Sequence, residues 1–441
     1  MTHSKPHRTE TLTDVFLGAM LSIFLLFPGF RGYQQITGQK VILFYLLTGG
    51  YVLGMIVILA AAALDGDKSL IKGTRSVCLV EKLVLGYWIL SGVSTVLSPY
   101  GTVAFWGSAR REGFVTITLY CLCCLLVARY GRPKEWMLWI FAGAMSVNCL
   151  LALLQLAGYN PLSLYPAGMN YYDGFKRYAG QFLGTIGNVD MLSALLCVSI
   201  PACAIGAIKL QRKRKFLLLV PLALSLTVLF WAFVSGGVLS VLGSIFLCAP
   251  VIAESKKLRK ILVITAAALM LLGVVVVYEA GDQFGGFVYE AQQILHGHIE
   301  DDFGSGRIYI WRKSLELVEG HLLFGSGPDT MGLRTDAVFE RFDQQLGITI
   351  RSFVDTAHNE YLNVLVHQGL LALLCYVGAV IAALLRWVRY APTDKTIALC
   401  GGCVLCYCIQ AFFGISSFLS APYFWIAIAL LCIAGKSGCA K

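Results

Sequence analysis

The sequence predicts an all-α integral membrane protein with about 12 transmembrane helices and one long extracytoplasmic loop containing short amphipathic helices. Of its 441 residues, 57% are hydrophobic and 14% are charged, whereas an average soluble domain has about 45–50% and about 25%. One aqueous core cannot bury so much apolar surface, because soluble cores stop growing near about 250–300 residues. The composition therefore excludes a soluble globular enzyme.

Apolar runs of about 17 to 25 residues, long enough to cross a bilayer, recur about twelve times. Charged residues inside these windows all lie near an end, as expected for a helical bundle in lipid. The runs begin near Leu12, Val41, Cys78, Gly113, Lys134, Val189, Phe216, Gly237, Ile261, Gly369, Thr396 and Phe418.

Lysine and arginine predict the orientation, because short cytoplasmic loops carry their excess. With both termini cytoplasmic, 22 of the 35 basic residues fall on the inner side and 12 on the outer side. We expect a multi-pass protein of the cytoplasmic (inner) membrane whose long loop is extracytoplasmic. The net charge of +10 is then membrane-surface charge, and nucleic acid is not an expected partner.

Four regions follow from this order. We expect N-terminal transmembrane helices over 1–98, a central bundle with arginine-bearing outer loops over 99–278, a catalytic loop over 279–368 and C-terminal helices over 369–441. The 15 cysteines fall almost entirely inside spans, so they predict neither a disulfide framework nor a metal site.

The long loop holds the unusual chemistry. It contains 14 of the 25 acidic residues and five of the seven histidines, and loops beyond about 15 residues are usually functional or disordered. An amphipathic helix is predicted to open at Arg307, with Ile308, Trp311, Leu315 and Val318 on one face and an Arg312–Glu316 pair on the other. Whether its arginines bind a ligand or only anchor the helix at the interface stays open.

A second helix is predicted from an N-cap at Asp355 or Thr356, which places His358 in its first turn. There the helix dipole disfavours the imidazolium and favours a nearby anion, so a neutral histidine could accept a proton beside a phosphate. A structural role for this histidine is the alternative.

Two other outer loops carry arginine. Lys176-Arg177-Tyr178 precedes Gly184-Thr185 and Gly187-Asn188, where small residues permit close backbone approach to a ligand. Arg110 and Arg111 lie in a shorter loop. Because outer arginines run against the positive-inside trend and offer a bidentate fork to phosphate oxygens, the three loops together predict an outward-facing anion site.

Two weaker patterns are interpreted as structural. His296-Gly297-His298 with Asp301-Asp302 has no thiol and no defined turn, so a solvated loop is preferred over a metal site. Gly325-Ser326-Gly327-Pro328 lacks the lysine of a phosphate-binding loop and is expected to be a turn.

The ordered motifs resemble the O-antigen ligase and polymerase family. The resemblance rests on residues 307–311, 323–328, 358–365 and 369–370, together with 177–188 and 107–113 upstream, and so covers about residues 100–385. One departure is that this chain reads Ser235-Gly236-Gly237 where many members have arginine after the serine.

The resemblance implies a membrane glycosyltransferase that takes its glycan from an undecaprenyl-diphosphate donor, with no cofactor and no metal. Arg177 and Arg307 would bind the diphosphate, with Arg110 and Arg111 as further candidates, and His358 would be the general base. Asn359, Trp311 and Tyr361 would support them. The acceptor would be a glycan, a lipid or a protein, and the transfer would invert the anomeric centre.

Two other functions stay open from the residues alone. A transporter or flippase for a lipid-linked or anionic substrate would be expected to carry charges at mid-membrane and internal repeats, and neither is evident. A receptor whose long loop binds a partner protein is the other. Within the family, the motifs do not separate a ligase from a polymerase.

Overall fold

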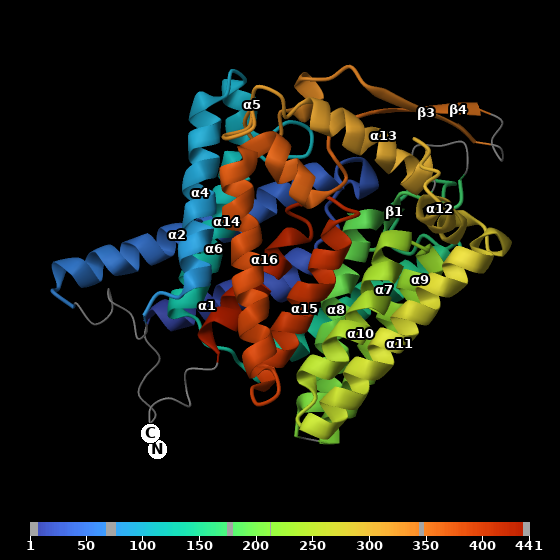
Figure 1. Ribbon diagram of the computed structural model, residues 1–441. Helices are drawn as coiled ribbons and strands as arrows, with labels where there is room; N and C mark the ends of the chain where they lie inside the picture. Colours follow the sequence, from blue (N-terminus) through green and yellow to red (C-terminus); the bar gives the residue numbers. More distant parts are fainter. Residues whose placement is uncertain (1–7, 68–75, 174–179, 212, 344–347, 435–441) are drawn as a thin grey trace.

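The computed structural model describes residues 8–67, 76–173, 180–211, 213–343 and 348–434. Helices dominate, and each of the twelve expected spans coincides with a helix (Figure 1). The helices are α1 (Arg8–Ala19), α2 (Ile36–Leu64), α4 (Leu79–Leu97), α5 (Gly101–Trp106), α6 (Phe114–Tyr130), α7 (Glu135–Leu156), α8 (Val189–Lys209), α9 (Leu219–Ala232), α10 (Ser235–Ile252), α11 (Lys256–Ala280), α12 (Gly286–Leu295), α13 (Phe303–Glu316), α14 (Glu360–Tyr390), α15 (Lys395–Ala411) and α16 (Ala421–Ile433).

Eight helical segments of the described chain are long and apolar enough to cross a membrane. They are α2, α4, α7, α8, α10, α11 and α14, together with α9 and the 3₁₀ turn Lys213–Leu218 before it. Helices α6, α15 and α16 are apolar but shorter, and α1 continues into a π-helical turn, Met20–Phe24. The protein is thus an all-α, multi-pass membrane protein, while twelve crossings remain a prediction.

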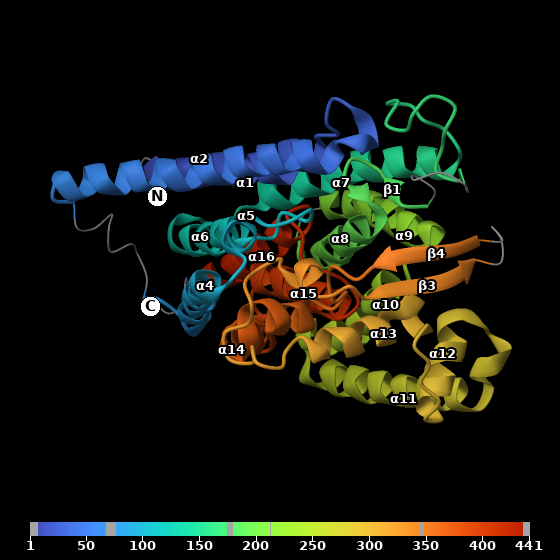
Figure 2. The same ribbon diagram turned by 90° about the horizontal axis from the view of Figure 1, so that it is seen from above.

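Helix α8 lies at the centre of the bundle and α11 at its margin (Figures 1 and 2). Of the apolar window of α8, 83% is buried inside the protein, against 6% for α11. Helix α8 packs against α9, α10 and α15 and is rich in serine, alanine and cysteine, whose small side chains allow backbones to approach closely. Its central position follows from that composition.

A buried lysine joins the first two long helices. Lys40 is completely buried in α2, and its Nζ donates to the carbonyl oxygens of Phe24 (2.8 Å), Leu25 (3.3 Å) and Phe27 (2.8 Å). These carbonyls end the helix that begins with α1, where the dipole is negative. A cation inside a helix long enough to cross the membrane is therefore satisfied by a helix C-terminus.

The segment between α11 and α14 gathers at one end of the bundle, at the top in Figure 1. It contains α12, α13 and three-residue 3₁₀ turns at Gly281–Gln283 and Met331–Leu333. It also contains an antiparallel hairpin, which the sequence did not predict, formed by β3 (Val338–Asp343) and β4 (Ile348–Phe353) with Val338 opposite Phe353. A second, minimal pair joins β1 (Phe182–Leu183) to β2 (Gly187–Asn188).

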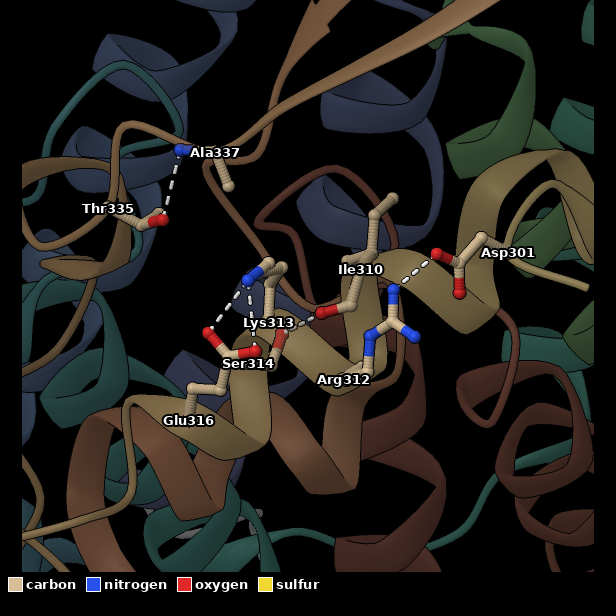
Figure 3. A network of polar contacts seen from close by, with 8 residues as sticks. All are labelled: Asp301, Ile310, Arg312, Lys313, Ser314, Glu316, Thr335 and Ala337. Atoms are coloured by element: carbon tan, nitrogen blue, oxygen red, sulfur yellow. Dashed lines mark hydrogen bonds and ion pairs between the residues drawn. The ribbon is translucent and has the colours of Figure 1, made fainter.

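The predicted amphipathic helix exists as α13, but its ion pairs differ from the prediction (Figure 3). Regular helix begins at Arg307, because Gly304, Ser305 and Gly306 have positive φ. Arg312 pairs with Asp301 rather than with Glu316, which instead bonds Lys313 at 2.9 Å. An earlier turn of the chain brings Asp301 within reach of the arginine.

The side of α13 that packs on the protein also differs from the expected face. Ile310 and Ser314 are buried, whereas Leu315 is 55% exposed. Ile310 packs in a small core with Met331, Val354 and Val366. The long segment thus has a hydrophobic core of its own, which the i, i+4 pattern of α13 alone could not locate.

Candidate functional site

A cavity of about 500 Å³ opens where α8 begins and α15 ends. Four other segments also contribute to its walls: the 107–113 loop, α13, the segment before α14 and the loop between α15 and α16. Its charged side chains, its histidine and its glutamine come from positions far apart in the sequence: Arg110, Asp190, Arg307, Asp355, His358 and Gln410. Three of the residues singled out from the sequence, Arg110, Arg307 and His358, are therefore brought together.

Arg307 enters the cavity from the first turn of α13. Its Nε donates to the carbonyl oxygen of Phe413 (3.1 Å) and its Nη1 to that of Gly304 (2.6 Å). Carbonyls fix the orientation of the guanidinium but do not neutralise it. Burial lowers the pKa of Arg307, opposed by Asp190 and Glu290, but an arginine stays protonated in proteins. The cavity therefore contains a cation that carbonyl oxygens orient and that is suited to a phosphate.

Arg110 lies opposite and is engaged by a carboxylate. Its Nε and Nη2 donate to Oδ2 and Oδ1 of Asp355 at 2.9 and 2.7 Å. The neighbouring Arg111 has a positive φ of 59° and an exposed side chain, and it does not line the cavity. The structure thus brings together only one of these two arginines with Arg307.

His358 precedes its helix instead of lying in the first turn. Helix α14 begins at Glu360, and Asn359 is its N-cap, accepting a hydrogen bond from the N–H of Leu362 at 3.0 Å. The N-cap predicted at Asp355 or Thr356 was therefore wrong by three or four residues. His358 has a φ of 46°, a conformation that directs the chain sharply into the helix.

The segment before His358 is fixed by the helix that follows it. The Oδ1 of Asn363 accepts hydrogen bonds from the Thr356 hydroxyl (3.0 Å) and from the N–H of Ala357 (3.2 Å). Tyr361 anchors the same turn by donating its hydroxyl to the carbonyl oxygen of Cys408 at 2.8 Å. The residues that follow His358 in the sequence thus hold it in place.

The electrostatic environment keeps His358 neutral. Burial, together with the positive charges of Arg110 and Arg307, lowers its pKa from 6.5 to about 4, and Asp355 opposes this shift. At neutral pH the imidazole can therefore accept a proton. Its neutrality arises from burial and from arginines, where the sequence had suggested the helix dipole.

Asp190 is a cavity residue that the sequence analysis did not single out. It lies in the first turn of α8, whose N-cap Asn188 accepts from the N–H groups of Asp190 (2.9 Å) and Met191 (3.2 Å). An acidic residue in the first turn is ordinary helix chemistry, so only the packing of α8 against the loops revealed this position. The available signal was its proximity to the Gly187-Asn188 motif.

The glycines before α8 have a structural role rather than the ligand-binding role expected from sequence. A Cβ on Gly184 would lie 2.5 Å from Oδ1 of Asn148. The buried Thr185 hydroxyl lies within hydrogen-bond distance of Oδ1 of Asn148 (2.7 Å) and of the carbonyl oxygen of Leu25 (2.8 Å), and it can donate to one of them at a time. The preceding Arg177, with Lys176 and Tyr178, lies outside the described residues.

Two buried carboxyls hold the cavity walls. Oε1 of Glu112 accepts from the Tyr120 hydroxyl (2.9 Å) and from the N–H of Phe418 (2.7 Å), which ties the α15–α16 loop to α6. Burial raises the pKa of Glu112 to about 8, with hydrogen bonds opposing and Asp329 adding to the effect. Asp329 accepts from the N–H of Ser108 (2.6 Å), which fixes the start of the Arg110 loop.

The 323–328 motif packs against the break in α14. The N–H of Gly327 donates to the carbonyl oxygen of His367 (2.9 Å), and a Cβ on Gly325 would lie 2.2 Å from the same oxygen. Helix α14 is interrupted at Gly369, whose φ is 85° and whose Cβ would lie 2.4 Å from the carbonyl oxygen of Leu323. The motif is the turn predicted from the sequence, and its glycines permit two backbones to touch.

The remaining supporting residue, Trp311, packs its ring edge-to-face against Phe412 at 5.4 Å. Its buried Nε1 has no acceptor among the described residues. At the sequence departure, Gly236 lines the cavity, and a Cβ there would lie 2.9 Å from Cβ of Phe413. An arginine at this position would therefore require Phe413 to move.

Elsewhere in the described residues, no three His, Cys, Asp or Glu side chains meet in a way that suits a metal ion. His296, one of the histidines weighed for metal binding, stacks on Tyr278 with ring centroids 4.2 Å apart.

Fold and cavity together define a polytopic membrane protein with a cavity lined by two arginines and a histidine at one end of its bundle. Residues 220–377 match the family model of O-antigen ligase. The matched range begins in α9, ends within α14 and includes Arg307 and His358. The family resemblance is confirmed over this range, and a glycan-transferring membrane enzyme is the class that it indicates. Comparison with curated proteins gave no match.

Proposed function

We propose that the protein is a membrane glycosyltransferase of the O-antigen ligase type. It transfers or polymerises a glycan from an undecaprenyl-diphosphate donor onto an acceptor hydroxyl, at the outer face of the cytoplasmic membrane. The reaction inverts the anomeric centre and proceeds without a metal. The observation that carries this proposal is one cavity that combines a carbonyl-held arginine, a second arginine and a neutral histidine.

Arg307 is the principal diphosphate ligand. Its guanidinium charge is oriented by carbonyls and is available to an anion, while Arg110 shares its charge with Asp355. In a partly buried site such cations bind phosphate oxygens strongly and stabilise the charge that develops as the polyprenyl diphosphate departs. These two cations supply the charge that a divalent metal would otherwise provide. Arg177 and Arg111 are retained as secondary candidates.

His358 is the general base. The acceptor oxygen forms a bond to the anomeric carbon, while the bond from that carbon to the diphosphate oxygen breaks and its electron pair leaves with the polyprenyl diphosphate. The acceptor proton passes to a ring nitrogen of His358, which becomes an imidazolium. Attack opposite the leaving group gives inversion.

Donor binding adjusts the strength of this base. In the unliganded site, burial and the two arginines hold the pKa of His358 near 4, which makes it a weak base. The diphosphate would neutralise the charge of the arginines and bring negative charge close to the ring, and both effects raise the pKa. The histidine thus becomes a competent base only when donor is present, which couples proton transfer to donor occupancy.

The test is transfer in vitro with purified protein in nanodiscs, a synthetic undecaprenyl-diphosphate oligosaccharide, an acceptor and EDTA. Wild type is compared with Arg307→Ala and His358→Asn, and with the exposed controls Arg312→Ala and His321→Asn from the same segment. We expect wild type and both controls to release polyprenyl diphosphate. The two cavity variants should release none. The size ladder of the products then separates a polymerase from a ligase.

Two results would contradict the proposal. Full transfer by a folded His358→Asn variant would exclude His358 as the general base. Donor binding without turnover for every acceptor class would show that the protein binds the donor but does not transfer the glycan. Movement of the donor across the bilayer without bond cleavage would instead identify a transporter or flippase.

A further inference from the structure

A second cavity, of about 220 Å³, lies at the end of the bundle opposite the candidate site. It is enclosed by α7, α8, α15 and α16, near the ends where α7 and α15 begin and α8 finishes. It shares no lining residue with the 500 Å³ cavity. Nothing in the glycosyl-transfer chemistry proposed above uses it.

The interior of this cavity is apolar. Side chains such as Phe141, Val198, Ala202, Leu399 and Ile426 line it. A buried water needs about two to four hydrogen-bond partners, and these residues provide none. Because α7 and α8 are apolar enough to span a membrane, hydrocarbon is the component of the surroundings that matches this lining.

The mouth of the cavity is basic. Three lysines, Lys134, Lys209 and Lys395, and one glutamate, Glu135, are its charged lining residues. Lys134 is paired with Glu10 at 2.9 Å, and Lys209 with Glu254 at 2.9 Å. Lys395 differs from both of them.

The ammonium of Lys395 is only loosely held. Its side chain is 55% exposed, and its nearest carboxylate, Glu135, is 3.9 Å away. Glu135 already accepts hydrogen bonds from Trp139 Nε1 (3.2 Å) and from Arg214 (3.1 Å). Lys395 is thus a cation at the mouth of an apolar cavity with most of its hydrogen-bonding capacity free.

We propose that this cavity binds one acyl chain of an anionic phospholipid whose phosphate contacts Lys395. Basic pockets between transmembrane helices are suited to acidic headgroups, and each lysine near the surface contributes attraction to them. The chain fills the space between α8 and α15, and the headgroup lies at the level of the lysines. The ligand is a structural lipid, distinct from the glycan donor at the other end.

The experiment is native mass spectrometry of the purified full chain in detergent, incubated with phosphatidylglycerol or with phosphatidylcholine of the same acyl length, with no glycan donor present. Wild type is expected to retain one phosphatidylglycerol and to release phosphatidylcholine. Ala202→Trp, which fills the cavity, should abolish retention. Lys395→Gln should weaken it about fivefold.

Two matched controls lie on the exposed surface of α11. Ala268→Trp adds the same bulk and Lys257→Gln removes the same charge, and both should bind as wild type does. Unfolding temperature and elution volume establish that each variant is folded. If Ala202→Trp does not fold, Lys395→Gln and the charge-reversed Lys395→Glu decide the outcome.

Equal retention of the two lipids would overturn the proposal. So would wild-type retention by a folded Ala202→Trp, or a loss in Lys257→Gln as large as that in Lys395→Gln. Because no donor is present, the result is independent of glycosyl transfer.

Discussion

Arg110 and Asp355 form a two-bonded ion pair between residues 245 positions apart, with donor–acceptor distances of 2.9 and 2.7 Å. The pair fastens the loop before α6 to the segment that leads into His358. It also sets two charges beside the imidazole, one that lowers the pKa of His358 and one that raises it. The position of His358 and its pKa therefore both depend on the ion pair between Arg110 and Asp355.

Removing the carboxylate should affect activity more than stability. In Asp355→Asn, Arg110 loses its ionic partner and the pKa of His358 falls further, so we expect kcat/KM to decrease about tenfold. The pair is about a third exposed, so the stability loss should stay within about 1 kcal/mol. Asp301→Asn, which frees the exposed Arg312 instead, is the control for transfer assays and thermal unfolding. Equal losses in both variants would refute the coupling.

Replacing the base separates chemistry from backbone strain. His358 has a positive φ, which asparagine tolerates and alanine does not. His358→Asn and His358→Ala should both lose about 10²- to 10⁴-fold in transfer rate, but only the alanine variant should also lose about 1 kcal/mol of stability. His321→Asn should match wild type. Retained transfer in His358→Asn would exclude the histidine as base.

The pH profile should report how donor binding changes the base. The acid limb of kcat/KM reports the free protein and is expected near pH 4, the pKa of His358 beside Arg110, Arg307 and Asp355. The limb of kcat reports the donor complex and should lie at higher pH, because the diphosphate offsets both arginines. Rates measured across pH at low and saturating donor give the two limbs. Coincident limbs would contradict the proposed coupling.

Glu112 should make stability depend on pH in the alkaline direction. Its pKa is raised from 4.5 to about 8, so the folded protein binds more protons than the unfolded chain between these values. Stability from this group is fully present below about pH 4.5 and is lost as pH rises through about 8. The unfolding temperature of wild type should be lower at about pH 9 than at about pH 5. In Glu112→Gln the difference between the two temperatures should be smaller.

The exposed Glu340→Gln, whose carboxylate pairs with Arg351 on the hairpin, is the control for Glu112→Gln. It should keep the pH dependence of wild type. A Glu112→Gln variant that loses as much stability as wild type on the same pH change would rule out Glu112 as the responsible group.

Two glycines test the contact between the 323–328 turn and α14. Gly325 and Gly320 both have positive φ, but a Cβ on Gly325 meets the carbonyl oxygen of His367 at 2.2 Å, whereas one on Gly320 meets open space. Gly320→Ala should cost about 1 kcal/mol and Gly325→Ala about 3 kcal/mol or more. Similar unfolding temperatures for the two variants would show that the backbone contact is unimportant.

Local patterns predicted the elements well, because helix formation depends on nearby residues. Apolar runs located all twelve helices of the expected spans, Arg307 opened the regular part of α13, and Gly369 interrupted α14 at the expected start of a span. The misplaced N-cap of α14, by contrast, involves a residue whose partner is distant in the sequence. Asn359 caps α14 in place of Asp355 because Asp355 is bonded to Arg110, and no pattern within the loop indicates that partner.

The sequence alone determined that this is a helical membrane protein, and it predicted a site in the loops that carry arginine and histidine. Hydrophobic periodicity, charge placement and ordered motifs are properties of short stretches, and they were sufficient for this. Only the tertiary structure decided that Arg307 is oriented by carbonyls, that Asp190 joins the cavity and that Arg111 does not line it. Burial and the charges of distant residues set the pKa of His358, and both exist only once α8, α13 and α14 have packed together.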